Sequence, residues 1–247
     1  MVLPMDNSLT PKRFVIVVFD MCSSSNLIED LTLSGNISEL RNFFIVMKEW
    51  LVKKTKALGF SLYKFTGDGW ILLFPEEVEG RQLYFFLKDL CRFYRSKFAE
   101  RIAGLLETNP GPMGLTFGIT FGELIKIRMV NTDEFIGRAL NVACRLQGAV
   151  NVKEKESNAA YKALLSSAVY NRYFKNIKDI NAVRSRRILH NIREGKEIQC
   201  IKIALLSDDP PMIEASPSAG GGFQSSATPI KPLALPEKNE KAAPIPR

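Results

Sequence analysis

Histidine is nearly absent from the sequence, and the cysteines are few and unpaired. The 247 residues include one His and four Cys. The cysteines are scattered without a Cys-x-x-Cys spacing, at Cys22, Cys91, Cys144 and Cys200. Such a pattern favours neither a zinc site nor a disulfide framework, and it suits a reducing compartment. With His190 as the single imidazole, His-based catalytic triads and His metal sites are also disfavoured.

Long hydrophobic runs are missing as well. No apolar segment reaches the roughly 18 residues that a membrane span needs. Residues 1–10 lack the basic start and the apolar stretch of a signal peptide. We therefore expect a soluble, cytoplasmic protein without a membrane partner.

Positive charge, in contrast, is in excess. The formal net charge is +8, from 34 Lys and Arg against 26 Asp and Glu. A basic folded domain suits a polyanionic partner, either nucleic acid or a small phosphorylated ligand. The charge alone leaves both possibilities open.

Composition divides the chain into three parts. Residues 1–12 are expected to form an N-terminal arm, and residues 13–205 carry the apolar periodicity of a folded domain. Eight of the 13 prolines lie beyond that domain, in a segment rich in Ser, Gly and Ala. Residues 206–247 are therefore predicted to be a disordered tail.

The apolar patterns of the central part predict alternating strands and helices. Strands are expected at 13–19, 60–65, 70–74, 115–123, 124–130, 186–190 and 197–205, and helices at 37–58, 79–106, 137–150 and 159–174. This order indicates an α+β fold with helices on one face of a mainly antiparallel sheet. Its front part matches a ferredoxin-like βαββαβ core, which additional C-terminal helices and a strand pair follow.

Two single Asp residues stand where apolar strands end. Asp68 lies between Gly67 and Gly69 in the predicted hairpin turn, and Asp20 follows the strand at 13–19. Each alone is explained by the preference of Asp for turns. In a ferredoxin-like topology, however, the first strand lies beside the hairpin, so the fold would bring Asp20 and Asp68 together.

Two carboxylates without His or Cys form an all-oxygen site suited to Mn²⁺ or Mg²⁺. Two such ions can activate an attacking hydroxyl and stabilise a leaving phosphate. Phosphoryl transfer also needs donors for the developing charge. Asn141 and Arg145 lie four residues apart on one helical face and fit that need. The polar loop after Asp20 can offer amides and hydroxyls to phosphate oxygens, through Ser23, Ser24 and Ser25.

Residues 13–205 resemble the class III nucleotidyl cyclases, because four motifs occur in the order seen in that family. The motifs are Phe19-Asp20, Lys64-Phe65-Thr66-Gly67-Asp68-Gly69, Gly118-Ile119-Thr120-Phe121-Gly122-Glu123 and the segment from Gly137 to Arg145. Residues 164–170 and 192–196 also look like closing segments of the family. Any one motif is weak, but four in order with similar spacing are fairly specific.

The resemblance implies a head-to-tail homodimer with two composite sites that convert a nucleoside triphosphate to a 3′,5′-cyclic nucleotide and pyrophosphate. By position, Asp20, Asp68 and the backbone of Met21 would hold two Mn²⁺ or Mg²⁺ ions. Asn141 and Arg145 of the partner chain would orient the ribose and stabilise the transition state. Other nucleotide-binding positions that the resemblance implies are Lys64 and Glu134 for the base and Ser23, Ser24, Ser25, Arg193 and Lys196 for the phosphates.

The sequence departs from the family pattern in two places. The loop after Asp20 lacks the aromatic residue that usually precedes the Ser or Thr. Lys64 with Glu134 matches neither the Lys with Asp or Thr of adenylate cyclases nor the Glu with Cys of guanylate cyclases. No receptor, membrane or sensor domain is expected before the catalytic unit.

With these departures the chain looks most like the stand-alone Pycsar cyclases. Those enzymes make cyclic UMP or cyclic CMP in anti-phage defence, and a separate cyclic-nucleotide-binding effector responds to the product. The resemblance therefore favours a pyrimidine cyclase, with uridylate ahead of cytidylate.

Other functions fit parts of the pattern. An adenylate cyclase making cyclic AMP is the nearest alternative and differs only in the base that it selects. A diguanylate cyclase needs a Gly-Gly-Asp/Glu-Glu-Phe motif at the hairpin, which this sequence does not have. An RNA-binding ferredoxin-like module needs a Lys/Arg-Gly-Phe-Gly-Phe-like run on its central strands, which is also missing, so we expect no nucleic-acid partner. A catalytically dead partner is a further possibility, although all four core catalytic positions are filled.

Overall fold

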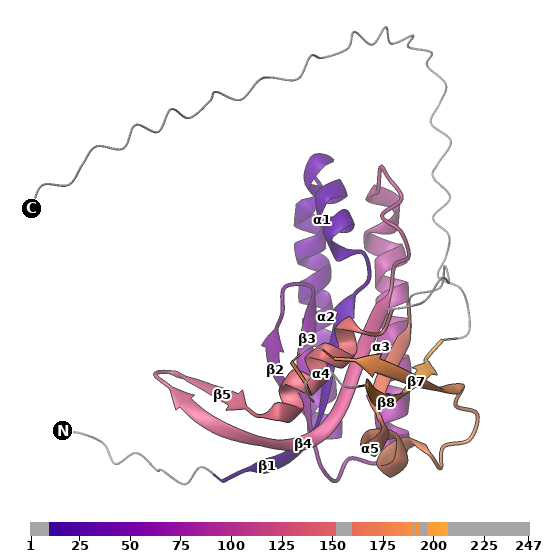
Figure 1. The fold of residues 1–247 in the computed structure, drawn as a ribbon. Coiled ribbons are helices and arrows are strands. Elements are labelled where there is room, and N and C mark those ends of the chain that lie inside the picture. Colours follow the sequence, from indigo (N-terminus) through magenta and orange to yellow (C-terminus); the bar gives the residue numbers. More distant parts are fainter. Residues whose placement is uncertain (1–9, 152–159, 190, 193–196, 207–247) are drawn as a thin grey trace, which may run out of the picture. The chain divides into compact units, whose positions relative to one another are not determined.

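A computed structural model describes residues 10–151, 160–189, 191–192 and 197–206 (Figure 1). Its elements are, in chain order, β1 (Lys12–Met21), α1 (Ser24–Leu33), α2 (Ile37–Leu58), β2 (Ser61–Phe65), β3 (Gly69–Pro75), α3 (Gly80–Arg101), a 3₁₀ turn (Ala103–Leu105), β4 (Leu115–Met129), β5 (Thr132–Ile136), α4 (Arg138–Gly148), β6 (Lys162–Ser166), α5 (Ser167–Val169), a π-helical turn (Tyr170–Phe174), β7 (Ala182–Ile188) and β8 (Glu197–Ala204).

The strands form one eight-stranded sheet in the order β2-β3-β1-β4-β6-β8-β7, with β5 paired to β4. Strands β4 and β6 pair in parallel, and the other described pairs are antiparallel. This arrangement confirms the predicted α+β class and the mainly antiparallel sheet. It also confirms that β1 lies beside the β2–β3 hairpin.

Strand β1 is buried on both faces because it is apolar throughout its length. Val15, Val17 and Phe19 belong to the large core under α2 and α3. Ile16 and Val18 face the other way and pack in a smaller core with α4. The expectation that helices cover one face of the sheet is therefore wrong. An apolar strand of this kind needs cover on both sides, and α4 supplies it on the second face (Figure 1).

Helices α2 and α3 pack on each other through a stripe of aromatic side chains. The rings of Phe43 and Tyr94 meet edge to face with centroids 5.5 Å apart, and Trp50 stacks on Phe93 at 5.1 Å. Phe86 and Phe98 are also buried. The aromatic stripe is thus part of the core.

Three segments differ from their predictions. Residues 124–129 continue β4 instead of turning back, because the reversal comes at Val130, which adopts a φ of 52°. Residues 162–166 form β6 rather than the start of a helix, since Ala163, Leu164 and Leu165 are buried inside the sheet. A short apolar run has no periodicity that separates a strand from a helix. Helix α1 begins at Ser24, inside the polar loop predicted after Asp20, and it buries Leu27 and Leu31 at helical spacing.

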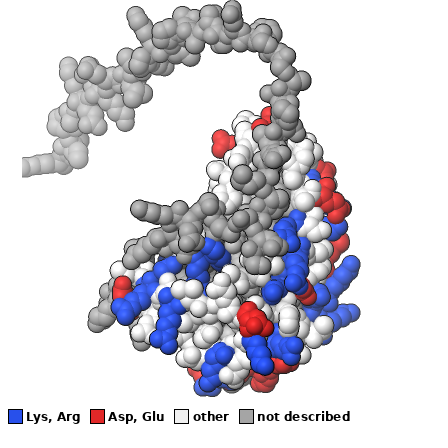
Figure 2. All heavy atoms as spheres, turned by 90° about the vertical axis from the view of Figure 1, so that its right-hand side faces the viewer, with Lys and Arg blue, Asp and Glu red and all other residues white. Residues whose placement is uncertain are grey.

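Lys and Arg side chains predominate over Asp and Glu on the face shown in Figure 2, in line with the basic composition. No helix of the described part is long and apolar enough to cross a membrane. Most of the predicted arm, residues 1–9, and nearly all of the predicted tail, residues 207–247, lie outside the described residues.

Candidate active site

Asp20 and Asp68 come together at one end of the central strands. In the sheet register, Asp20 at the end of β1 lies opposite Gly69, the residue after Asp68. A Cβ atom on Gly69 would lie 1.9 Å from the carbonyl oxygen of Phe19, so only glycine allows this approach. The turn is closed by a hydrogen bond from the amide of Thr66 to the carbonyl of Gly69, at 3.0 Å. The convergence predicted from the topology is therefore present.

The two carboxylates interact directly. The pKa of Asp20 is raised to about 8, first by burial and then by a hydrogen bond with Asp68 and the negative charge of Asp68, while a hydrogen bond from the amide of Met21 lowers it. The Oδ1 atom of Asp20 is buried and accepts no hydrogen bond from any residue that the structure describes. A buried carboxylate oxygen without a partner is costly. The pair therefore has unused capacity for a positively charged ligand.

The start of α1 holds the second carboxylate in place. The hydroxyl of Ser24, the first residue of the helix, donates a hydrogen bond to Oδ2 of Asp68. Ser23 adopts a left-handed conformation with φ 54°, and its hydroxyl donates to the carbonyl of Pro112 at 3.2 Å. Ser25 is exposed. Of the three predicted serines, Ser24 alone has a described contact with the carboxylate pair.

A loop after α3 is attached to α1 at several points. The side chain of Asn26 donates to the carbonyl of Pro110 at 3.1 Å, and the amide of Cys22 donates to the carbonyl of Gly114 at 2.9 Å. Buried Asp30 accepts hydrogen bonds from the amides of Glu107 and Thr108, at 3.2 and 2.7 Å, and from the Thr108 hydroxyl. These bonds fix the loop after α3 against α1, whose first residue, Ser24, contacts Asp68.

The donor set at this site suits a divalent cation that prefers oxygen. The residues that the structure describes contain no cluster of three or more His, Cys, Asp and Glu that could hold a metal by themselves. Mg²⁺ commonly binds one or two carboxylates and takes its remaining ligands from substrate phosphates and water. Asp20 and Asp68 fit that pattern, because the unpartnered Oδ1 of Asp20 is available. Met21 ends β1 next to them, so its predicted backbone role is compatible with the position.

Lys64 and Glu134, the predicted base-reading residues, contact each other. The ammonium of Lys64 in β2 lies 3.2 Å from Oε2 of Glu134 in β5. Tyr63 joins them, because its hydroxyl donates to Oε2 of Glu134 at 2.5 Å and accepts from the amide of Phe135 at 3.0 Å. The pKa of Glu134 is lowered, first by the hydrogen bond from Tyr63 and then by that from Lys64. The sequence analysis missed Tyr63. A register shift between Leu62 and Lys64 interrupts the strand at that point, and such bulges leave no clear sequence signal.

Asn141 and Arg145 lie on the outer side of α4. The inner side packs closely on β4, where a Cβ on Gly118 would lie 2.2 Å from the carbonyl oxygen of Ala143. At 100° per residue, positions 141 and 145 point almost opposite to position 143. Both side chains are exposed, and neither forms a hydrogen bond or ion pair with a residue that the structure describes. Within one chain they therefore point away from the sheet that carries Asp20.

Gln147 is a second residue that the sequence analysis missed. From α4, its side-chain amide donates to the hydroxyl of Thr116 at 3.1 Å, and Thr116 lies opposite Asp20 in the sheet. This hydrogen bond holds the C-terminal end of α4 against the residue of β4 that pairs with Asp20. The predicted phosphate-binding residues Arg193 and Lys196 lie outside the described residues.

The sequence matches no protein-family model and no curated protein sequence. Solved structures do match. A bacterial light-regulated adenylyl cyclase superposes with a TM-score of 0.61 and 16% identity over 86% of this chain, which spans 58% of that protein's chain. The adenylyl cyclase CyaB from P. aeruginosa gives 0.59 and 16%, over 79% of this chain and 95% of the other. The guanylyl cyclase Cya2 gives 0.58 and 14%, over 78% and 92%.

Adenylyl and guanylyl cyclases both appear among the similar structures, so the likeness does not select a base. The chain has the fold of the class III nucleotidyl cyclases.

Proposed function

We propose that the chain is a nucleotidyl cyclase that converts a nucleoside triphosphate to a 3′,5′-cyclic nucleotide and pyrophosphate. In this reaction the ribose 3′-hydroxyl attacks the α-phosphorus, and the bond from that phosphorus to the leaving pyrophosphate breaks. The observation that carries the proposal is the meeting of Asp20 and Asp68, with a buried Asp20 oxygen that has no partner among the described residues. The cyclase fold supports it.

Asp20, Asp68 and the backbone carbonyl of Met21 would hold two Mg²⁺ or Mn²⁺ ions. When bound, such ions supply positive charge that favours ionisation of the 3′-hydroxyl and stabilises the leaving phosphate. The chain's own residues set the geometry of the site. Ser24 orients Asp68 by its hydrogen bond, and the polar loop at the start of α1 offers donors to phosphate oxygens.

We infer that each active site needs two copies of the chain. Asn141 and Arg145 point away from the sheet of their own chain and have no described partner, so a second copy can present them to Asp20 and Asp68. Arg145 would then stabilise negative charge on the phosphates, as a planar cation with several donors does well. Asn141 would hold the ribose. Arg193 and Lys196 are proposed to contact the phosphates.

For the base, we propose a pyrimidine, with uracil preferred to cytosine. Glu134 can accept a hydrogen bond from a ring N–H or an amino group, and Lys64 can donate to a ring carbonyl or nitrogen. Tyr63 holds Glu134 in position. The support for a pyrimidine is that this pair departs from both purine-reading patterns. On this proposal the product signals to a separate cyclic-nucleotide-binding effector in cytoplasmic anti-phage defence.

The test is product identity. Purified protein is incubated separately with ATP, GTP, CTP and UTP in the presence of Mn²⁺, and the products are resolved by mass, with Asp68→Ala protein as the blank. Cyclic UMP or cyclic CMP is the expected product. Cyclic AMP alone would retain the cyclase proposal but overturn the pyrimidine preference. No cyclic product from any of the four would overturn the cyclase proposal itself.

A further inference from the structure

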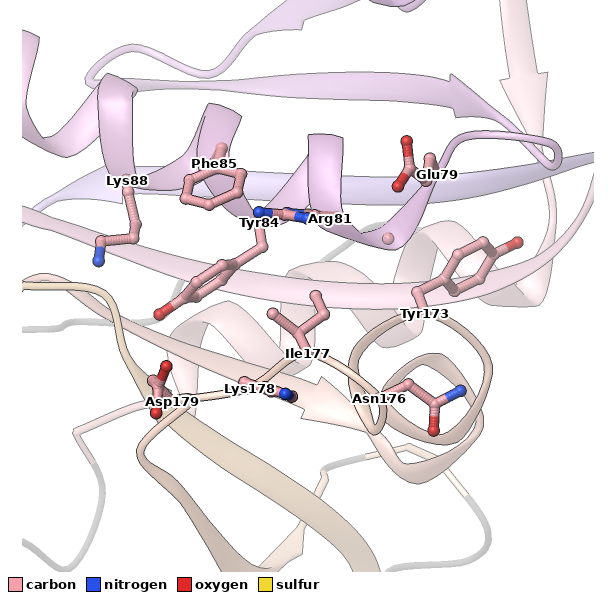
Figure 3. A pocket seen from close by; sticks show the side chains of 11 residues that line it. Glu79, Arg81, Tyr84, Phe85, Lys88, Tyr173, Asn176, Ile177, Lys178 and Asp179 are labelled. Atoms are coloured by element: carbon pink, nitrogen blue, oxygen red, sulfur yellow. The ribbon is translucent and has the colours of Figure 1, made fainter.

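A cavity lies at the opposite end of β3 from the carboxylates. Asp68 directly precedes β3, and the strand ends at Pro75, about 20 Å further on. There, the start of α3 and the segment after the π-helical turn enclose a cavity of about 710 Å³ (Figure 3). A volume of this size is typical of sites for small molecules. The cavity shares no lining residue with the proposed active site.

The two walls of this cavity are held in a fixed relation. A Cβ on Gly80, where α3 begins, would lie 1.7 Å from the carbonyl oxygen of Tyr173 in the π-helical turn. The backbones are therefore in direct contact on one side of the cavity. Tyr173 is also attached, because its hydroxyl donates to the carbonyl of Glu76 at 2.8 Å. The cavity is thus built into the packing of α3 on the π-helical turn.

A tyrosine hydroxyl without a hydrogen-bond partner among the described residues lines this cavity. Tyr84 of α3 is only 6% exposed, and its ring lies along the cavity wall in Figure 3. Its hydroxyl forms no hydrogen bond with any residue that the structure describes. Burial and, to a smaller degree, the charge of Asp179 raise the pKa of Tyr84. The group is therefore a neutral hydrogen-bond donor that a ligand can use.

Three cations face the same cavity, from both of its walls. Arg81 and Lys88 come from α3, and Lys178 comes from the segment across the cavity (Figure 3). None of the three forms an ion pair within the described part of the chain. Arg81 instead lies over the ring of Phe85 at 5.6 Å, and Lys88 lies over the ring of Tyr84 at 5.4 Å. The three cations outnumber the two carboxylates of the lining, Glu79 and Asp179, and are available to an anionic ligand.

The remaining lining groups complete a set of contacts for a nucleotide. The ring of Phe85 is 43% exposed, which leaves a surface for a flat base. Asp179 can accept hydrogen bonds from ribose hydroxyls or an exocyclic amino group. Aromatic stacking and Arg or Lys contacts to phosphate are the usual means of binding such ligands.

We propose that this cavity is a second nucleotide-binding site, separate from the catalytic one. The phosphate binds between Arg81 and Lys178, the base lies against Phe85, and Tyr84 and Asp179 bond the sugar or the base edge. This proposal does not depend on the cyclase reaction, because no residue of the proposed active site takes part.

The experiment is calorimetric titration of the full-length protein with AMP, GMP, CMP and UMP, in buffer with EDTA so that metal-dependent binding is removed. We expect at least one monophosphate to bind. Arg81→Ala and Lys178→Ala should each weaken its affinity by at least about tenfold. Phe85→Ala and Tyr84→Phe, which keep the buried core intact, should each weaken it several-fold.

Two controls separate this site from other sources of binding. Lys53→Ala removes an exposed Lys on α2, and Arg145→Ala removes the cation proposed for catalysis; both should leave the affinity unchanged. The proposal is overturned if no monophosphate binds, or if Arg145→Ala rather than Arg81→Ala abolishes binding. It is also overturned if inorganic phosphate binds as tightly as the nucleotide, since the ring contacts would then contribute nothing.

Discussion

At the scale of single residues, the carboxylate pair depends on a glycine that carries no chemistry. A side chain on Gly69 would collide with backbone atoms of Phe19 and Asp20 rather than with a flexible group. The strands could relieve this collision only by separating. The identity of residue 69 therefore decides how closely Asp68 can approach Asp20.

We expect Gly69→Ala to lower the free energy of unfolding by about 3 kcal/mol. Urea denaturation measures the change. Gly148→Ala is the matched control, because a Cβ there meets nothing within 4 Å and alanine is favoured over glycine in a helix. Equal stability of the two variants would contradict the close approach of β3 to β1.

We expect the negative charge of Asp20 to be needed for catalysis but not to stabilise the folded protein. Because burial and Asp68 raise the pKa of Asp20 to about 8, its ionised form is disfavoured in the folded protein. Asp20→Asn should therefore leave the melting temperature unchanged or higher, while cyclase turnover falls at least about 100-fold. Thermal denaturation and product formation are measured on the same sample. A variant that loses stability but retains turnover would refute this assignment.

The sequence predicted this site because its residues carry local signals. Asp68 stands between two glycines, and Asp20 ends an apolar strand, so topology alone could bring them together. Tyr63 and Gln147 carry no such signal. Their contacts depend on a strand irregularity and on the docking of α4, and both arise only in the folded chain.

At the scale of elements, α1 and the loop after α3 form one unit through Asp30. Burial raises the pKa of Asp30, but hydrogen bonds from Thr108 and from the amide of Glu107 outweigh it and hold the pKa below its ordinary value. A carboxyl group with a lowered pKa stabilises the fold above its unfolded pKa of about 3.9, and the contribution is lost as pH falls through the lower folded value.

We expect Asp30→Asn to lower the free energy of unfolding at pH 7 by about 2 kcal/mol, since hydrogen bonds to a charged acceptor are lost. The difference between wild type and variant should shrink as the pH falls below about 4. Denaturant unfolding at both pH values tests this. Asp89→Asn, which removes an exposed partner of Arg92, should have little effect at either pH.

Prediction of the elements succeeded where periodicity was long and failed where it was short. Helix α2 begins and ends at the predicted residues, 37 and 58, because its apolar stripe repeats over several turns. Residues 162–166 form β6 although the sequence predicts a helix there, because a run of three buried apolar residues is compatible with either structure. Strand β6 pairs in parallel with β4, which is distant in the sequence. The local sequence of residues 162–166 does not indicate this pairing.

At the scale of the whole molecule, the two halves of the proposed catalytic set belong to different faces of one chain. Asp20 and Asp68 lie at the strand ends, and Asn141 and Arg145 lie on the outer side of α4. If two copies complete each other's sites, inactive variants from opposite halves should restore activity when combined.

Equal amounts of Asp68→Ala and Arg145→Ala, allowed to exchange subunits, should recover about one quarter of wild-type turnover. Half of the dimers are then mixed, and each mixed dimer holds one intact site of two. Mixing Asp20→Ala with Asp68→Ala is the control, and it should recover nothing because both changes affect the same half. Recovery in neither mixture, with mixed dimers verified, would argue against shared sites.

Because Asn141 and Arg145 lie on the outer side of α4, the rate of catalysis would depend on how often two copies of the chain meet. A catalyst whose site is divided between two copies turns over in proportion to the square of its concentration when the copies are mostly apart. Doubling the amount of this chain would then quadruple the rate of product formation, and halving it would reduce that rate to one quarter. The abundance of the chain would therefore control the rate of product formation more steeply than in an enzyme whose site lies within one chain.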